Sequence, residues 1–201
     1  MKLGLITDIH EHVDHLIAAL DRLRSLGVDQ IVMFGDVFEM GERIEETCRL
    51  LSEANVIGVW GNHDFGLSFQ PGTDLRERFG PGVIDFMTSL KPHLEIDRCY
   101  FAHVEPWLNP EELCDLWYFD GLPDNPEKLR RIFEAVPNRL MFAGHFHTWL
   151  LASPERTEDW SGESPVSLAG GRFFVIVGAL CEGRFATLDT ESSELLPYSL
   201  V

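Results

Sequence analysis

The sequence predicts an α/β fold, on three observations. Up to residue 64, short apolar runs alternate with longer stretches whose apolar residues recur at helical spacing. This βαβαβ pattern indicates parallel strands joined by right-handed crossovers. After residue 147 the apolar runs are short and separated by turn residues, which indicates further strands without intervening helices. Five polar clusters follow apolar runs directly, so we expect the functional side chains in loops at strand ends.

The first third of the chain is predicted to hold three strands and two helices. The strands are Leu3–Thr7, Ile31–Phe34 and Val56–Trp60. The first helix, His12–Leu26, ends at Gly27, a residue type that favours helix termination. Its expected buried stripe comprises Leu16, Ile17, Leu20, Leu23 and Leu26. The second helix, Arg43–Ala54, is expected to bury Ile44, Cys48 and Leu51.

The middle of the chain is less regular. Glycines and prolines make Phe65–Gly82 a predicted loop that holds one short helix, Thr73–Arg78. The other elements predicted here are a helix at Val83–Leu90, a strand pair His93–Ile96 and Tyr100–Ala102 joined at Asp97-Arg98, a helix at Pro126–Val136 with Leu129, Ile132 and Phe133 on one face, and a strand at Leu140–Ala143.

The last quarter of the chain is predicted to contain strands only. They are Thr148–Ala152, Phe173–Val177, Phe185–Leu188 and Leu195–Ser199. The polar stretch Ser153–Gly171 between the first two is predicted to be a long hairpin or surface loop.

Length and composition are those of one globular domain covering residues 1–201. No apolar stretch approaches the roughly 20 residues of a membrane span. The apolar part of the N-terminus is too short for a signal peptide, so we expect the mature protein to begin at Met1 in the cytoplasm. The four cysteines form no C-x-x-C pair, which fits reduced thiols in that compartment.

The formal net charge is −17 at pH 7. Bulk nucleic acid and anionic membranes need a basic face, so both are excluded as main partners. Most of the carboxylates are expected to be solvated. An anionic substrate would be repelled unless cations stood where it binds, and two divalent ions would offset several carboxylates there.

The polar clusters contain the residue types that bind divalent metals. They are Asp8-Ile9-His10, Gly35-Asp36, Gly61-Asn62-His63-Asp64, the lone His103, and Gly144-His145-Phe146-His147. Residues two apart in an extended segment point the same way, so each D-x-H or H-x-H pair offers two ligands to one side. A single histidine is more often a surface or satisfied residue. The complete set in this order, each behind a predicted strand, indicates a site for two metal ions.

This constellation resembles the calcineurin-like metallophosphoesterase superfamily, in particular its small prokaryotic phosphoesterase and phosphodiesterase type. The matching motifs run from Asp8 to His147. The chain departs from the usual pattern in two places: Val104 stands where the family usually has Gly, and Glu11-His12 replaces the common Gly-Asn. Neither change removes a ligand. The resemblance implies a four-layer αββα sandwich, with two mixed β-sheets flanked by helices.

The resemblance also implies a ligand set. One ion would be held by Asp8, His10, Asp36 and His147, and the other by Asp36, Asn62, His103 and His145. Asp36 would bridge the two ions, and a hydroxide activated by them would be the nucleophile. Oxygen and imidazole ligands suit Mn, Fe, Zn, Ni or Mg, with Mn favoured.

His63 is the candidate catalytic residue outside the ligand set, as an acid or transition-state stabiliser. Asp64 is expected to fix the tautomer of His63, although a cap or turn role is its alternative. Glu39 is expected either to orient a ligand histidine or to be a plain acid at the start of a helix. The roles of His12 and of Trp117-Tyr118-Phe119 stay open; these aromatics could line the site, or form a core or dimer patch.

The sequence therefore predicts metal-dependent hydrolysis of a small phosphomonoester or phosphodiester. Two alternatives remain: a dinucleoside polyphosphate or nucleotide-lipid pyrophosphate hydrolase, and a non-catalytic scaffold of the same fold. The scaffold is disfavoured because all eight ligand and catalytic positions are present. The substrate, the native metal and the oligomeric state, including a homo-oligomer, are left open.

Overall fold

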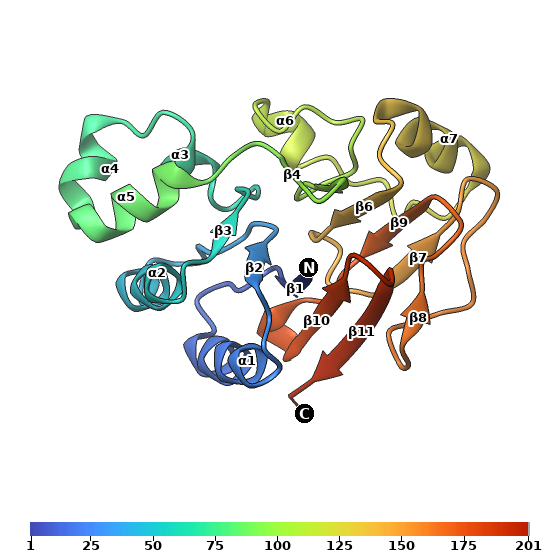
Figure 1. Cartoon of the computed structure of the whole chain (residues 1–201). Coiled ribbons are helices and arrows are strands. Elements are labelled where there is room, and N and C mark those ends of the chain that lie inside the picture. Colours follow the sequence, from blue (N-terminus) through green and yellow to red (C-terminus); the bar gives the residue numbers. More distant parts are fainter. Residues whose placement is uncertain (201) are drawn as a thin grey trace.

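The computed structural model describes residues 1–200 and contains two mixed β-sheets that pack face to face with helices on their outer sides (Figure 1). This four-layer αββα arrangement confirms the predicted fold class. The strand order is β3-β2-β1-β10-β11-β8 in the first sheet and β4-β5-β6-β9-β7 in the second.

The first sheet joins the beginning and the end of the chain. Its strands are β1 (Lys2–Ile6), β2 (Gln30–Met33), β3 (Ile57–Gly58), β8 (Val166–Ser167), β10 (Arg184–Asp189) and β11 (Glu194–Ser199). The first three run parallel, with Leu5 opposite Val32, and β1 pairs antiparallel with β10. The predicted right-handed βαβ start of the chain therefore forms one half of this sheet.

The second sheet is built from the middle of the chain. Its strands are β4 (Leu94–Ile96), β5 (Cys99–Phe101), β6 (Leu140–Ala143), β7 (Leu150–Ala152) and β9 (Phe173–Ile176). Strands β5, β6 and β9 run parallel, and the edge strands β4 and β7 are antiparallel. The turn between β4 and β5 places Asp97 and Arg98 at φ 47° and 68°, as a tight hairpin requires.

The helices are α1 (Val13–Ser25), α2 (Ile44–Glu53), α3 (Phe65–Ser68), α4 (Thr73–Arg78), α5 (Pro81–Ser89), α6 (Leu113–Leu116), α7 (Pro126–Ala135) and the 3₁₀ turn η1 (Leu180–Glu182). In Figure 1, α1 and α2 lie on the side of the first sheet and α7 lies beyond the second. None of the helices among residues 1–200 combines the length and the apolar character needed to cross a membrane.

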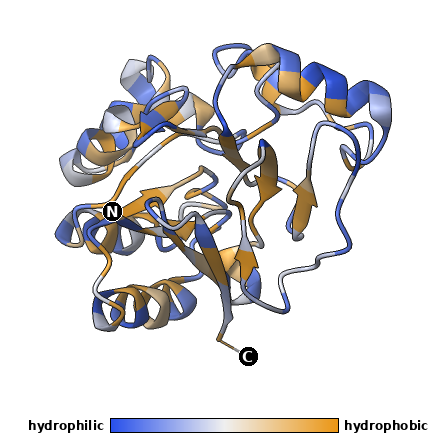
Figure 2. Cartoon of the chain, turned by 45° about the vertical axis from the view of Figure 1, so that its right-hand side comes forward, coloured by the Kyte–Doolittle hydropathy of each residue, from blue (hydrophilic) through white to orange (hydrophobic). Residues whose placement is uncertain are grey.

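Three apolar clusters correspond to the three interfaces between the four layers. One packs α1, α2 and α5 on the outer face of the first sheet, with Leu23 and Leu51 fully buried. The second lies between the sheets and contains Phe34, Phe101 and Phe142. The third packs α7 on the outer face of the second sheet. Figure 2 shows the strands largely in hydrophobic colours, whereas the helices carry both colours.

Strand alternation explains how one strand serves two interfaces. On β6, Leu140 and Phe142 point between the sheets, whereas Met141 and Ala143 pack beneath α7. All four side chains are buried. Strands buried on both faces read as continuous apolar runs, which is why these runs were recognisable in the sequence.

Several elements differ from the prediction. Ile17 is 41% exposed, because α1 buries Val13 and Ala19 along with Leu16, Leu20 and Leu23. The Gly80-Pro81-Gly82 stretch opens α5 instead of ending a loop, with Pro81 in the first turn, where its missing N–H costs nothing.

The polar stretch Ser153–Gly171 is also more than a surface loop. It leaves the second sheet after β7, contributes β8 to the edge of the first sheet beside β11, and returns to β9. The strand predicted at Val56–Trp60 is reduced to Ile57–Gly58, followed by one bridge between Val59 and Lys91.

One acid in this fold is buried without a full set of partners. Glu105 follows β5, is 2% exposed, and its Oε2 has no hydrogen-bond partner. Burial raises the pKa of Glu105 to about 7. Because this value lies above that of an unfolded glutamate, ionising Glu105 destabilises the folded protein, and stability is lost as the pH rises from about 4 to about 7.

Glu105→Gln should therefore stabilise the protein at pH 8, by on the order of 2 kcal/mol, and change stability little at pH 5. Urea denaturation at the two pH values measures the difference. Glu111→Gln, at an exposed position in the following loop, is the matched control and should have no such pH dependence. An equal effect of Glu105→Gln at both pH values would contradict the assignment.

Candidate metal centre

The predicted ligands meet because five strands end at the same place. Asp8 follows β1, Asp36 follows β2, and Asn62 follows β3 in the first sheet. His103 follows β5, and His145 and His147 follow β6 in the second. The carboxyl ends of these parallel strands open into a common crevice, which is where α/β sheets place their sites.

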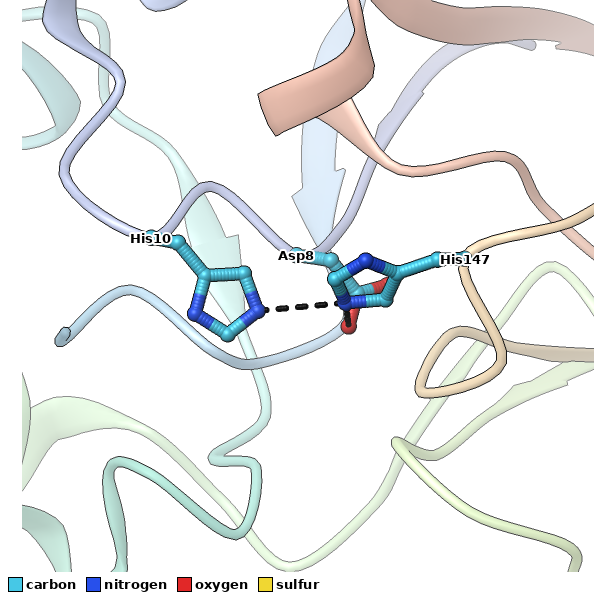
Figure 3. A group of neighbouring side chains, drawn as sticks. All are labelled: Asp8, His10 and His147. Carbon is cyan, nitrogen blue, oxygen red and sulfur yellow. Dashed lines mark hydrogen bonds and ion pairs between the residues drawn. The ribbon is translucent and has the colours of Figure 1, made fainter.

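The first group consists of Asp8, His10 and His147, drawn in Figure 3. The Nε2 atoms of the two histidines face each other at 3.2 Å, and Asp8 Oδ1 lies 3.4 Å from His147 Nε2. Asp8 is fully buried, and it accepts a hydrogen bond from Thr7 Oγ1 and from the backbone N–H of His145. These contacts hold the carboxylate against the two imidazoles.

The second group surrounds Asp36. Its Oδ2 lies 3.4 Å from His103 Nε2 and 3.6 Å from His10 Nε2, so this one oxygen faces both histidines. His103 is fully buried, and its Nδ1 lies 2.6 Å from the carbonyl oxygen of Phe34. A carbonyl oxygen only accepts, so Nδ1 of His103 carries the hydrogen. Nε2 of His103 then faces Asp36 and also Asn62, whose Oδ1 lies 2.9 Å away.

His145 completes the set from the other side. Its Nδ1 lies 3.0 Å from Asn62 Oδ1, while its Nε2 is buried and has no hydrogen-bond partner. A buried nitrogen without a partner is costly unless something outside the protein chain satisfies it. The side-chain amide of Asn62 lies between His103 and His145, and its neutral oxygen contacts both rings.

The charges at the centre are strongly coupled. Burial would lower the pKa of His103, but the adjacent Asp36 carboxylate outweighs it and raises the pKa to about 9. Burial would likewise raise the pKa of Asp36, but His103 holds it below its ordinary value. The hydrogen bond to Asp8 raises the pKa of His147 to about 10. Without metal, protons on His103 and His147 therefore offset the two carboxylates.

The other two histidines among the predicted ligands, His10 and His145, stay neutral. Burial, followed by the nearby His103, lowers the pKa of His145 to about 4, and burial lowers the pKa of His10. Both imidazoles therefore offer a free lone pair at neutral pH. Two carboxylates, an amide oxygen and four imidazoles converge, which is a donor set suited to divalent cations.

Three overlapping groups of residues bring their ligand atoms within 4.8 Å of one another. They are Asp8–His10–His147, Asp8–Asp36–His103 and His10–Asp36–His63. The sharing of Asp36, Asp8 and His10 between groups is the arrangement that two neighbouring cations need, and the unpartnered Nε2 of His145 points to the same conclusion. The residues present thus fit the expected metal pair.

Backbone strain is concentrated at the same positions. Asp8, His10, Asp36, His145 and His147 all have positive φ, between 46° and 69°. Such conformations cost non-glycine residues on the order of 1 kcal/mol or more each and persist only where packing enforces them. They turn each side chain from the strand direction into the crevice.

Glycines allow the loops to approach one another. A Cβ on Gly61 would overlap Asp36 Oδ1, and one on Gly144 would overlap Thr7 Oγ1. A Cβ on Gly35 would lie 2.6 Å from the backbone nitrogen of Gly61. The glycines in front of Asp36, Asn62 and His145 are therefore required by close contact between the loops.

His63 and Asp64 do not form the expected pair. Both oxygens of Asp64 accept backbone hydrogen bonds: Oδ1 from Val37 and Phe38, and Oδ2 from Gly61. Within residues 1–200 no hydrogen bond joins Asp64 to the His63 ring, so the expected tautomer contact is wrong, and Asp64 instead ties the loop after β2 to the loop after β3. Burial raises the pKa of this carboxyl to about 6.

The acid that faces the ring of His63 is Glu39. Its Oε2 lies 3.7 Å from His63 Nδ1 and 2.8 Å from His10 Nδ1, although the latter nitrogen has no partner at hydrogen-bond angles. The His63 and His10 rings meet edge to face, with centroids 4.8 Å apart. Glu39 is thus placed to orient both imidazoles, which is one of the two roles that the sequence predicted for it.

Glu11 is a residue whose importance the sequence did not reveal. Its carboxylate is nearly buried and accepts three backbone N–H groups of the loop before α2, from Glu39, Gly41 and Arg43, at 2.6–2.9 Å. The departure from Gly-Asn at this point was the only signal. Glu11 therefore fixes the loop that carries Glu39. Glu39, His12 and His15 line one cavity of about 320 Å³.

Comparison with known proteins agrees with this geometry. Residues 1–192 match the profile of the calcineurin-like phosphoesterase superfamily domain. A protein of Methanocaldococcus jannaschii, itself uncharacterized, is 25% identical over 169 residues. The alignment covers 76% of this chain, which spans only 65% of that relative's length.

Two solved structures share the fold. A metallophosphoesterase from Sphaerobacter thermophilus superposes with a TM-score of 0.79 at 20% identity, covering all of this chain and 88% of the other. An archaeal phosphodiesterase superposes with a TM-score of 0.59 at 16% identity, with both chains fully covered.

Glu11→Ala should destabilise the protein by about 2–4 kcal/mol, because it leaves three N–H groups of one loop without their acceptor. Glu11→Gln, which keeps one acceptor oxygen, should cost less. Chemical denaturation measures both. Glu42→Ala, at an exposed position in the same loop, is the control. Equal stability of Glu11→Ala and Glu42→Ala would show that the carboxylate does not hold the loop.

Proposed function

Because the chain belongs to the calcineurin-like phosphoesterase superfamily, we propose that it is a metal-dependent hydrolase of a small phosphomonoester or phosphodiester. The observation that carries the proposal is the convergence of Asp8, Asp36 and histidines in three overlapping groups, whose ligand atoms lie within 4.8 Å of one another. The buried Nε2 of His145, which has no hydrogen-bond partner, supports it. A non-catalytic scaffold would not need this strained and charged arrangement.

The residues divide into two ligand sets in this proposal. Asp8, His10 and His147 hold one ion, and Asn62, His103 and His145 hold the other, with Asp36 shared between them. When bound, two divalent ions supply Lewis acidity that makes water a nucleophile near neutral pH and offsets the charge of a phosphate. Manganese is the favoured metal, among Mn, Fe, Zn, Ni and Mg.

The chain's own side chains complete the reaction. Water supplies the oxygen of the new P–O bond, the P–O bond to the leaving group breaks, and the leaving oxygen takes a proton. His63 is the group proposed to stabilise or protonate that oxygen, since its ring adjoins His10 and stays partly exposed. Glu39 keeps the His63 ring oriented from Nδ1.

The compartment belongs to the same proposal. All four cysteines are free, which supports a reducing cytoplasm as the place where the enzyme works.

A metal-supplemented assay tests this function directly. The purified chain, loaded with each of the five metals, is offered p-nitrophenyl phosphate, its bis ester, cyclic nucleotides and dinucleoside polyphosphates. Hydrolysis of a monoester or diester supports the proposal. Cleavage of dinucleoside polyphosphates alone would favour the pyrophosphate hydrolase alternative, and no hydrolysis with metal bound would favour the scaffold.

Asp36→Asn should abolish metal binding and hydrolysis together, because a neutral amide cannot offset two cations. Elemental analysis of the metal-loaded protein gives the stoichiometry, which should be two ions in the wild type and none in the variant. Circular dichroism checks that the variant folds. A wild-type sample that is active with one ion would refute the dinuclear part of the proposal.

His63→Ala should leave both ions in place and lower turnover about 10²–10⁴-fold, the usual worth of a positioned acid–base group. The loss should be smallest for p-nitrophenyl esters, whose leaving group needs little protonation, and greatest for alkyl esters. His147→Ala is the contrast, since it should weaken metal binding and be partly rescued by added metal. Rescue of His63→Ala by excess manganese would place His63 among the ligands.

A further inference from the structure

Large apolar side chains are exposed beside the metal centre. Among residues 1–200 the exposed large apolar residues are Met1, Ile17, Met40, Ile57, Leu113, Trp117, Phe119 and Leu122. Four of them fall within the ten residues from Leu113 to Leu122, which we call the aromatic segment. Trp117 is 52% exposed and Phe119 is 65% exposed, so these rings are not core residues. Exposed apolar side chains gathered in one place mark binding sites more often than scattered ones do.

The two aromatic rings contact two different histidines of the centre. The Trp117 ring lies 5.2 Å from the ring of His63, centroid to centroid. The Phe119 ring lies 6.3 Å from His145 and 5.8 Å from Phe146. Trp117 therefore stands on the side where His63 would meet the leaving oxygen, and Phe119 stands over the opposite ligand set.

The aromatic segment is held firmly in this position. Lys128, at the start of α7, donates to the carbonyl oxygens of Asp120, Gly121 and Leu122 and forms an ion pair with Asp120. Tyr118 donates its hydroxyl to the same Asp120 carboxylate. A rigid segment that presents aromatic rings loses little entropy when a ligand binds.

Resting on the proposed function, we propose that Trp117 and Phe119 determine specificity by stacking on a flat, neutral ring of the leaving group. The substrate class is then a phosphate ester of a ring-bearing alcohol, with the ring either a nucleobase or an aryl group. Aromatic side chains bind both through their π-faces without reading their edges.

Charge favours a neutral ring over a further phosphate. Glu39 lies beside His63, and Asp120 lies next to Phe119 in the aromatic segment. Lys128, the cation nearest to the segment, is already engaged by Asp120 and three carbonyl groups. A leaving group with additional phosphates would therefore approach two carboxylates, and Lys128 would not be free to pair with those phosphates.

The experiment measures selectivity rather than activity alone. For the metal-loaded wild type, Trp117→Leu and Phe119→Leu, kcat/KM is determined with phenyl phosphate, adenosine 5′-monophosphate and ethyl phosphate. Leucine keeps the apolar bulk and removes the ring. Each substitution should lower the ratio of ring ester to ethyl ester about 5- to 100-fold, as expected for loss of a stacking side chain. The adenosine and phenyl arms distinguish a nucleobase from an aryl group.

Leu122→Ala is the matched control, since Leu122 is exposed on the same segment and has no ring. It should leave the ratio unchanged. Binding of phenylphosphonate and ethylphosphonate, measured by calorimetry, repeats the comparison without turnover. Ring-dependent phosphonate binding by a metal-loaded protein that hydrolyses neither monoesters nor diesters would support the stacking role and refute the proposed function.

An unchanged ratio with normal hydrolysis would refute the stacking role and leave the proposed function intact. The absence of ring preference in both assays would also overturn it. Sedimentation of the same variants gives the other occupant: a leucine variant that dissociates a dimer while keeping the wild-type ratio would show that the rings bind a second copy of the chain.

Discussion

The site depends on how closely the loops at the strand ends approach one another. Gly61 leaves room for the Asp36 carboxylate, and Gly144 leaves room for Thr7 and Asp8, where any side chain would overlap existing atoms. This contact brings ligands from two separate sheets within reach of one cation. It also buries Asp8, Asp36 and His103, so these charged groups interact in a low-dielectric environment.

Close approach has an electrostatic consequence. His103 gives its Nδ1 hydrogen to a backbone carbonyl, which leaves Nε2 facing two acceptor oxygens, and those acceptors need a positive charge between them. A second proton on His103 can supply it, and so can a metal ion. Proton and metal therefore compete for the same space, so metal binding releases protons. The positive φ values of Asp8 and Asp36 are a further energetic cost of bringing these groups together, which the folded sheets impose.

The sequence predicted the fold class, and for a physical reason it also singled out residues that the structure brings together. Asp8, Asp36, His103 and His145 follow strands whose residues are almost all buried, so a continuous apolar run marks each position, even for the lone His103. Contacts between loops left no such mark. Adjacency suggested that Asp64 serves His63, yet one of its oxygens accepts from the backbone of the loop after β2 and the other from Gly61. The bonds of Glu11 cross 28 to 32 positions, a distance at which periodicity carries no information.

The residues proposed to bind metal and those proposed to contact substrate lie in different parts of this molecule. This explains why the sequence indicated a role for the first and left the role of Trp117-Tyr118-Phe119 open. The ligands sit on strand ends that the two sheets fix. The aromatic segment instead belongs to an irregular connection between β5 and α7. Lys128 positions this segment by donating to backbone carbonyl oxygens, which every residue type has, so the contact leaves no mark in the sequence. Exposure of Trp117 is visible only once the fold is known. Such a connection can change its rings while the centre stays intact, so substrate preference can vary on an unchanged metal site.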